Sequence, residues 1–183
     1  PNLYYRRSRD YHLKERSPEA LAEMFGHMGT LNAQTTQIDT QALLKFVDQH
    51  AMADQQRLGA VGYCMSGPFV MWAAAQFPQR FRSIASIHGA NMATQAPDSP
   101  HRMAPLIQCE CYFACAEIDK WAPPADIALL EASLTAAKVK HRIEWYPQAE
   151  HGFVFPQRAG IYKATAAERH WERLFRLFGR TLR

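Results

Sequence analysis

From Leu58 onward, short apolar segments typical of strands alternate with helix-like segments, and this alternation constrains the fold more than any other feature of the sequence. The strand-like segments cover Leu58–Tyr63, 82–88, 108–116 and about 142–146. Helices are expected at 68–77, from Pro123–Pro124 onward, and from about 160 to the end, with an apolar face of Trp171, Leu174, Phe175, Phe178 and Leu182. Strands joined through helices require crossover connections. We therefore predict an α/β fold with a mostly parallel sheet and helices on both faces.

The first 57 residues are predicted to hold a loop and two helices. Residues 1–9 (PNLYYRRSR) are aromatic and basic and are typical of a loop that leaves a strand. Ser17 and Pro18 predict a helix start, since serine caps well and proline is tolerated in the first turn. The apolar positions of this helix are Leu21, Met24, Phe25 and Met28, and Gly29 ends it. Thr36 and Asp39 resemble the capping box of a second helix, whose apolar stripe would be Ile38, Leu43, Phe46 and Val47.

Length and composition exclude several classes of protein. The chain has 183 residues, 48% of them apolar and 21% charged, which suits a single domain over residues 1–183 with a core of its own. No apolar run approaches the roughly 20 residues of a membrane helix, so no membrane partner is expected. The formal net charge of +4 suits an anionic small-molecule partner and indicates nucleic acid only weakly.

The four cysteines indicate free thiols rather than disulfides. No secretory leader opens the sequence, so a reducing, cytoplasmic location is expected for Cys64, Cys109, Cys111 and Cys115. Neither C-x-x-C nor H-x-x-x-H is present, so we expect no metal site and no cofactor.

The segment Gly62-Tyr63-Cys64-Met65-Ser66-Gly67 lies where a strand passes into a helix. Small residues flanking a nucleophile are typical of the strained strand–turn–helix elbow of hydrolases. The helix N-terminus would favour the thiolate of Cys64, and the backbone N–H of Met65 would be one donor of an oxyanion hole. The alternative is that Cys64 is a buried structural cysteine.

Two further residues follow later strands and complete a candidate set. Carboxyl ends of parallel strands meet at one edge of a sheet, and the chain order nucleophile, acid, histidine is that of α/β-hydrolases. Asp119 is the predicted acid, with Glu117 as a weaker candidate, and His151 is the predicted base. His88 and His101 are competing bases, but their loop follows the strand after the nucleophile.

The motif GYCMSG at 62–67, the Asp119 loop, HGF at 151–153 and the opening PNLYYR together resemble the dienelactone hydrolase family. The resemblance covers essentially the whole chain. It implies an α/β-hydrolase fold, hydrolysis of enol-lactones, and roles for Cys64, Asp119 and His151 as nucleophile, acid and base. It also implies that Arg6, which ends PNLYYR, contacts the carboxylate of the substrate.

The chain departs from the family pattern at two places. The family's second carboxylate-binding arginine falls at Phe155 here, and Arg158 is three residues out of register. The match also begins partway into the pattern, so the first strands, a second oxyanion donor and a glutamate near the thiol would be missing. We expect the strand at Leu58–Tyr63 to have an open edge, and a lone chain of this kind to be marginal in stability or to associate.

The sequence thus predicts a lactone or ester hydrolase that acts through a covalent thioester and needs no cofactor, with a small-molecule partner and no predicted oligomeric state. Two alternatives are a carboxylesterase or thioesterase for another small acyl group, and a truncated domain without activity. A nucleic-acid binder is a further alternative, because Arg169, Arg173, Arg176 and Arg180 form a stripe on the last helix. A solvated face opposite the Trp171 stripe explains those arginines more simply.

Overall fold

The computed structural model describes residues 2–183, so Pro1 of the predicted opening loop lies outside it. Eleven elements are described, and they run in chain order as α1 (Pro18–Met28), α2 (Ala33–Asp48), β1 (Leu58–Tyr63), η1 (Cys64–Ser66), α3 (Gly67–Gln76), β2 (Phe81–Ile87), η2 (Pro100–Leu106), β3 (Glu110–Ile118), α4 (Pro124–Ala136), β4 (His141–Glu150) and α5 (Ala164–Thr181). The elements η1 and η2 are short 3₁₀ helices.

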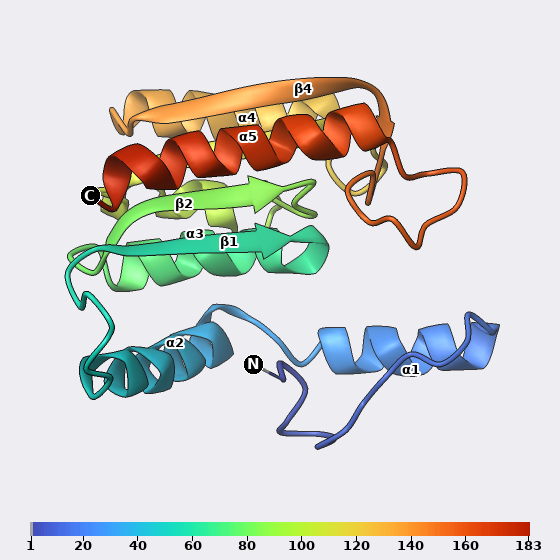
Figure 1. The fold of residues 1–183 in the computed structure, drawn as a ribbon. Coiled ribbons are helices and arrows are strands. Elements are labelled where there is room, and N and C mark those ends of the chain that lie inside the picture. The colour runs from blue at the N-terminus through green and yellow to red at the C-terminus, as the bar shows by residue number, and fades with distance from the viewer. Residues whose placement is uncertain (1) are drawn as a thin grey trace.

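The four described strands form one parallel sheet in the order β1-β2-β3-β4. Figure 1 shows α3 and α4 behind the sheet and α5 in front of it, so each face carries a helical layer. This arrangement confirms the predicted parallel sheet with helices on both faces. β1 lies at the edge of the described sheet, as expected for a strand whose neighbour is not among these residues.

Two apolar clusters, one on each face of the sheet, hold these layers together. The first joins α3 and α4 to the sheet through fully buried side chains such as Met71, Ile84 and Leu130. The second joins α5 to the opposite face through Leu174, Leu177 and Phe153. Because side chains alternate along a strand, neighbouring positions of β2 supply both clusters. The site at the strand ends therefore rests on a sheet that is packed on both sides.

The second helix differs from its prediction at its start and on its buried face. Asn32 caps α2 and forms a reciprocal capping box with Thr35, so the box predicted at Thr36 and Asp39 is wrong. α2 packs against α3 through Thr40 and Leu44, the buried positions of the helix. The predicted stripe points elsewhere: Ile38, Leu43 and Phe46 are exposed. Helical spacing thus predicted the wrong buried face, because it could not say which neighbour is present to cover the helix.

The last helix also differs from its prediction. α5 begins at Ala164, and Trp171 and Phe175 are exposed whereas Leu174 and Leu177 are buried. The arginine stripe is not simply a solvated face, because Arg173 and Arg180 form ion pairs with carboxylates of the sheet. These ion pairs hold the arginine side of α5 against β3 and β4.

Strand and helix ends shift by one to four residues elsewhere. β3 is displaced toward the C-terminus and β4 is longer than predicted, whereas the 3₁₀ helix η2 lies partly in a stretch predicted to be a loop. Among residues 2–183, no helix combines the length and the apolarity needed to cross a membrane.

Candidate active site

The strand β1 ends in a sharp turn that presents the side chain of Cys64. Cys64 has φ 55°, in the left-handed region that side chains other than glycine rarely adopt. Such a conformation costs on the order of 1–3 kcal/mol and persists only where the surroundings enforce it. Ser66 provides part of that enforcement, since its hydroxyl accepts a hydrogen bond from the backbone N–H of Tyr63 (2.8 Å) and donates one to the Tyr63 carbonyl (2.8 Å).

The turn also depends on Gly62. A Cβ atom at this position would lie 2.1 Å from the backbone oxygen of Ser66, which is far inside van der Waals contact. The chain can therefore fold back so tightly only with a glycine here. This finding agrees with the small residue that an elbow requires before its central side chain.

Asp119 and His151 meet beside this turn. Asp119 follows β3 and His151 follows β4, and the imidazole Nδ1 lies 2.7 Å from the carboxylate Oδ2 of Asp119. The other oxygen of Asp119 accepts a hydrogen bond from the backbone N–H of Trp121 (2.9 Å), and the carboxylate is fully buried. Both carboxylate oxygens are thus occupied, which fixes the carboxylate and, through it, the orientation of the imidazole ring.

The thiol of Cys64 lies within electrostatic reach of this pair. Burial raises the pKa of the thiol, but interaction with the His151 imidazole, the backbone N–H of Met65 and the positive charge of Arg158 outweigh burial, and the pKa falls below its usual value. The backbone N–H of Met65, predicted from the sequence as an oxyanion donor, is thus among the groups that stabilise the thiolate. An electropositive, partly exposed setting is the one that makes a cysteine reactive.

His151 is correspondingly basic. Burial lowers the pKa of its imidazole, but Asp119 and Cys64 raise it, with a net result of about 9. Nε2, the nitrogen not bound to Asp119, is buried and has no hydrogen-bond partner among the described residues. Its contact with the sulfur is thus looser than a well-formed hydrogen bond, which is common in active sites without substrate. An imidazole anchored at Nδ1 and unpaired at Nε2 can take up a proton from a neighbouring group.

The structure places the other three candidates from the sequence, Glu117, His101 and His88, at different positions. Glu117 accepts a hydrogen bond from the backbone N–H of Gln148 (2.6 Å), so Asp119 is the carboxylate that meets the imidazole. His101 lies in η2, where its Nδ1 is 2.8 Å from the hydroxyl of Ser99.

His88 is the third candidate, and it lies against His151. The two rings make an edge-to-face contact with centroids 4.9 Å apart. Burial lowers the pKa of His88 to about 3, so this ring is neutral near pH 7, and neither of its nitrogens has a hydrogen-bond partner among the described residues. Its φ of 39° is strained as well. His88 therefore forms a neutral wall beside the basic imidazole.

Arg6 is occupied by a different partner. Its guanidinium binds the carboxylate of Asp39 in α2 through two hydrogen bonds, of 2.9 and 2.7 Å. The hydroxyl of Tyr5 donates to the same carboxylate (2.9 Å). The opening segment is thus anchored to α2, and Arg6 would have to exchange Asp39 for a substrate in order to bind a carboxylate.

Sequence reasoning missed Tyr4, which brings the opening segment to the elbow. Its hydroxyl donates toward the sulfur of Met65 (3.3 Å), and its ring stacks on His27 of α1. Burial is the main cause that raises the pKa of this phenol, with smaller contributions from Tyr11 and from Cys64 itself. No spacing rule links Tyr4 to a residue 61 positions away.

Arg158 supplies the positive charge next to the thiol. Its Nη1 donates to the carbonyl of His151 (2.7 Å), and a Cβ at Gly152, which has φ 93°, would lie 1.9 Å from that nitrogen. Phe155, at the position of the family's arginine, instead packs its ring against Tyr63 and His88. Arg158 thus keeps a cation near the site, although the position of the family's arginine is occupied by an aromatic ring.

Metal chemistry has no evident ligand set here. Within residues 2–183, no group of three or more histidine, cysteine or acidic side chains is arranged to hold a metal ion.

The fold and the strand-to-helix turn define the class: this is an α/β-hydrolase fold, with cysteine at the position of the usual serine. The model of the dienelactone hydrolase family matches residues 1–182, so the chain belongs to that family.

Curated relatives extend well beyond this chain. The carboxymethylenebutenolidase of Rhodococcus opacus is 27% identical over 158 residues, which cover 82% of this chain and 62% of that protein. A Synechocystis protein provisionally given the same name is 31% identical over 143 residues, covering 76% of this chain and 57% of that protein. The chain therefore spans about three-fifths of the length of these relatives.

Solved structures agree on the fold. A provisionally assigned dienelactone hydrolase from Klebsiella pneumoniae superposes with a TM-score of 0.83 at 23% identity, over 98% of this chain and 73% of that one. The likeness at this level of identity concerns the architecture alone.

Proposed function

We propose that the chain forms the catalytic part of a lactone or carboxylic ester hydrolase in which Cys64, His151 and Asp119 act as a triad. The observation that carries this proposal is the 2.7 Å contact between His151 and a buried, doubly anchored Asp119, beside a cysteine on a strained turn. The family membership and the names of the curated relatives support the same reaction class.

In the proposed first step, the proton of Cys64 resides on the His151 imidazole, since the pKa of His151 is raised to about 9 and that of the thiol is lowered, and the thiolate attacks the carbonyl carbon of the substrate. A C–S bond forms, the carbonyl π electrons move onto oxygen, and the Met65 N–H donates to the oxyanion. Collapse of this intermediate breaks the C–O bond, and the ring oxygen leaves as an alkoxide or enolate that takes the proton from His151. The product of this step is a thioester on Cys64.

In the second step, His151 removes a proton from water and the resulting hydroxide attacks the thioester. The C–S bond then breaks, the acid is released, and the sulfur recovers its proton from the imidazolium. Asp119 stays ionised throughout, because its role is to orient the ring and stabilise its positive charge.

A substrate with a free carboxylate suits the charges around this site. The guanidinium of Arg158 is close enough to lower the pKa of Cys64, so it would also attract an anionic group on the substrate. Arg6 is a further carboxylate ligand in this proposal, provided that a substrate displaces Asp39.

A carboxylesterase or thioesterase for an uncharged acyl group is the second candidate. It is favoured by Phe155, which presents an aromatic ring to the site where the family pattern has an arginine, and by the pairing of Arg6 with Asp39. The two candidates differ in one measurable preference: a lactonase of this kind hydrolyses carboxylate-bearing lactones faster than their methyl esters.

The experiment that tests the reaction class combines turnover with trapping. The protein is incubated with an activated lactone, with and without Cys64→Ala, and quenched samples are digested and analysed by mass spectrometry. We expect an acyl adduct on the peptide that carries Cys64, and a loss of turnover of roughly 10³-fold or more in Cys64→Ala. Turnover that persists in Cys64→Ala, or an adduct on Cys109 instead, would refute the proposal.

A further inference from the structure

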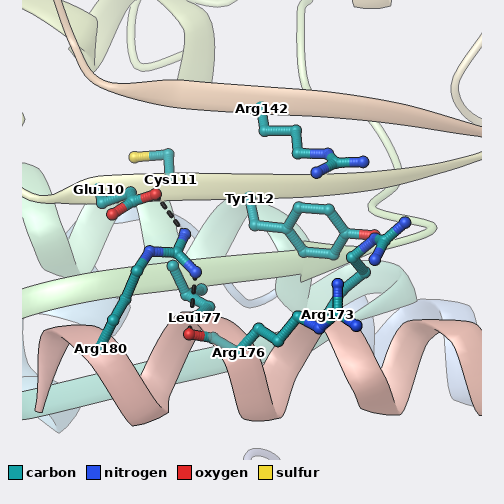
Figure 2. A pocket seen from close by; sticks show the side chains of 8 residues that line it. All are labelled: Glu110, Cys111, Tyr112, Arg142, Arg173, Arg176, Leu177 and Arg180. Carbon is teal, nitrogen blue, oxygen red and sulfur yellow. Dashed lines mark hydrogen bonds and ion pairs between the residues drawn. The ribbon is translucent and has the colours of Figure 1, made fainter.

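A small cavity lies between α5 and the sheet, away from the strand ends that carry Cys64, Asp119 and His151. Its volume is about 100 Å³. Figure 2 shows the residues that line it, which come from the start of β3, from β4 and from α5: Glu110, Cys111, Tyr112, Arg142, Arg173, Arg176, Leu177 and Arg180. Four of these eight side chains are arginines.

The carboxylates at this cavity are already bound to cations. Glu110 pairs with Arg180 (2.5 Å) and with Lys140 (3.1 Å). Glu144, which is buried behind the wall of the cavity, pairs with Arg173 (2.9 Å) and with Arg142 (3.3 Å), and also with Arg169. Each carboxylate is thus shared by two or more cations.

Positive charge therefore exceeds negative charge here. Six cationic side chains surround two carboxylates, which leaves a surplus of four charges; the cations are Lys140, Arg142, Arg169, Arg173, Arg176 and Arg180. The net charge of the whole chain is also +4, so the positive and negative charges outside this cluster cancel. The acidic residues of α5 itself are Glu168 and Glu172. Both are exposed and form no ion pair within residues 2–183.

Of the six cations, Arg176 is the one that pairs with neither Glu110 nor Glu144 among the described residues. It lines the cavity, and its guanidinium takes part in no ion pair or hydrogen bond among the described residues. In Figure 2, Arg142 of β4 lies on one side of the Tyr112 ring and Arg173 and Arg176 of α5 lie on the other. All three arginines line the same cavity.

The walls of the cavity are held rigid by a buried network. The hydroxyl of Tyr112 donates to Glu144 (3.0 Å) and lies 2.8 Å from the hydroxyl of Tyr146. Arg173 binds Glu144 through both Nε and Nη2. Because these contacts are made without a ligand, an incoming anion would not have to order Tyr112 or Arg173, and only the unpaired Arg176 would have to settle on it.

We propose that this cavity binds a phosphate group. The planar guanidinium fork of arginine matches the oxygens of a phosphate, and four arginines line this cavity, of which the carboxylates leave Arg176 unpaired. With a volume of about 100 Å³, the cavity has room for a group of a few heavy atoms such as a phosphate. The ligand is therefore inorganic phosphate or the phosphate end of a small phosphorylated molecule.

This site is separate from the candidate active site. β3 begins with Glu110 at the cavity and ends with Ile118, next to Asp119, and eight residue steps at about 3.3 Å each put the two ends roughly 25 Å apart. The proposal therefore does not depend on the proposed hydrolase activity.

The test is a calorimetric titration of the protein with sodium phosphate at constant ionic strength, with sodium chloride as the reference. We expect saturable binding of phosphate, and Arg176→Gln to weaken it about tenfold or more, because a charge-assisted hydrogen bond is lost. The matched control is Arg102→Gln, which removes the same charge from an exposed arginine outside the cavity. This control should bind phosphate like the unaltered protein.

A parallel titration with glycerol 2-phosphate distinguishes the two sources of the phosphate group. Tighter binding of the ester than of inorganic phosphate points to a phosphorylated molecule, and the reverse points to free phosphate. The proposal is overturned if neither ligand shows saturable heat beyond chloride, or if Arg102→Gln weakens binding as much as Arg176→Gln. Circular dichroism of both variants checks that each is folded.

Discussion

Residues 2–57 and residues 58–183 differ in how they are held. α1 has no buried residue and α2 has two, whereas α3 buries eight of its ten residues. The first region reaches the rest of the molecule through polar and aromatic contacts, such as Tyr4 with Met65 and Phe25 with Trp121. Every member of the proposed triad belongs to the second region, where packing on both faces of the sheet can hold side chains to a fixed geometry.

The largest expected difference between the regions concerns two aspartates. Asp119→Asn removes the charge that orients His151 and stabilises its protonated form, and we expect kcat to fall roughly 10³- to 10⁴-fold. Asp39→Asn, the matched change in the first region, should leave kcat close to that of the unaltered protein. Steady-state kinetics on one activated ester measures both. Equal losses in the two variants would show that the first region takes part in the chemistry.

The same aspartate governs how stability depends on pH. The pKa of His151 is raised from 6.5 to about 9, so its contribution to stability is fully present below pH 6.5 and is lost as pH rises through 9. The lowered pKa of Cys64 acts in the opposite direction: its contribution is present above pH 9.0 and is lost as pH falls through the lowered value. Urea unfolding at pH 6, 8 and 10 should show a decline with pH that is smaller in Asp119→Asn. The same decline in both proteins would contradict the assigned interaction.

Two leucines in helices compare the packing of the regions directly. Leu130 of α4 is fully buried and Leu43 of α2 is 44% exposed. Leu130→Ala should lower the free energy of unfolding by about 2–5 kcal/mol, through lost burial and a residual cavity. Leu43→Ala should lower the free energy of unfolding much less than Leu130→Ala does. Chemical denaturation of both variants decides the matter, and similar losses would mean that the exposed face of α2 is covered in solution.

Two glycines should respond with opposite signs. Gly62→Ala puts a Cβ against the backbone of Ser66, and we expect a loss of about 1–3 kcal/mol together with reduced activity as the turn opens. Gly26→Ala in α1 meets no atom within 4 Å, so a gain of about 0.5–1 kcal/mol is expected from the better helix former. Thermal unfolding followed by circular dichroism reports both. Destabilisation by Gly26→Ala would show that α1 packs more closely than its exposure indicates.

The smallest expected effect is that of Arg6→Gln. Its ion pair with Asp39 is partly exposed, and pairs of this kind contribute about 0–1 kcal/mol to stability. If Arg6 also receives a substrate carboxylate, KM for a carboxylate-bearing lactone rises while KM for its methyl ester does not. An equal change for both substrates would remove Arg6 from the binding site.

The sequence predicted the second region far better than the first, for physical reasons. Periodicity and turn residues located all four described strands, and the signal is plainest for β2 and β3, which are buried on both sides and therefore need a continuous apolar segment between two breaks. The meeting of Asp119 with His151 followed from parallel topology alone, since both residues follow strand ends. Asp119 rather than Glu117 is the carboxylate that contacts His151, although the two positions differ by only two residues.

Contacts that no local rule governs were not predictable. The apolar stripe of α2 was identified, but which face is buried depends on α3, which comes later in the chain. Arg158 can bind the carbonyl of His151 only because Gly152 leaves room for its side chain. The arginines of α5 pair with carboxylates some 30 to 70 residues away, so their spacing indicated a stripe without its partners.

The central claim, that Cys64 is set apart as a nucleophile, is tested most directly by the rate of alkylation of each cysteine. The protein is treated with a small excess of iodoacetamide at several pH values, and the labelled peptides are quantified by mass spectrometry. Cys64 should react fastest, with a midpoint below that of an ordinary thiol, and His151→Ala should slow it. Cys115, whose pKa burial raises to about 12, should stay unlabelled. A Cys64 that reacts no faster than Cys115, or whose rate is unchanged in His151→Ala, would contradict the account.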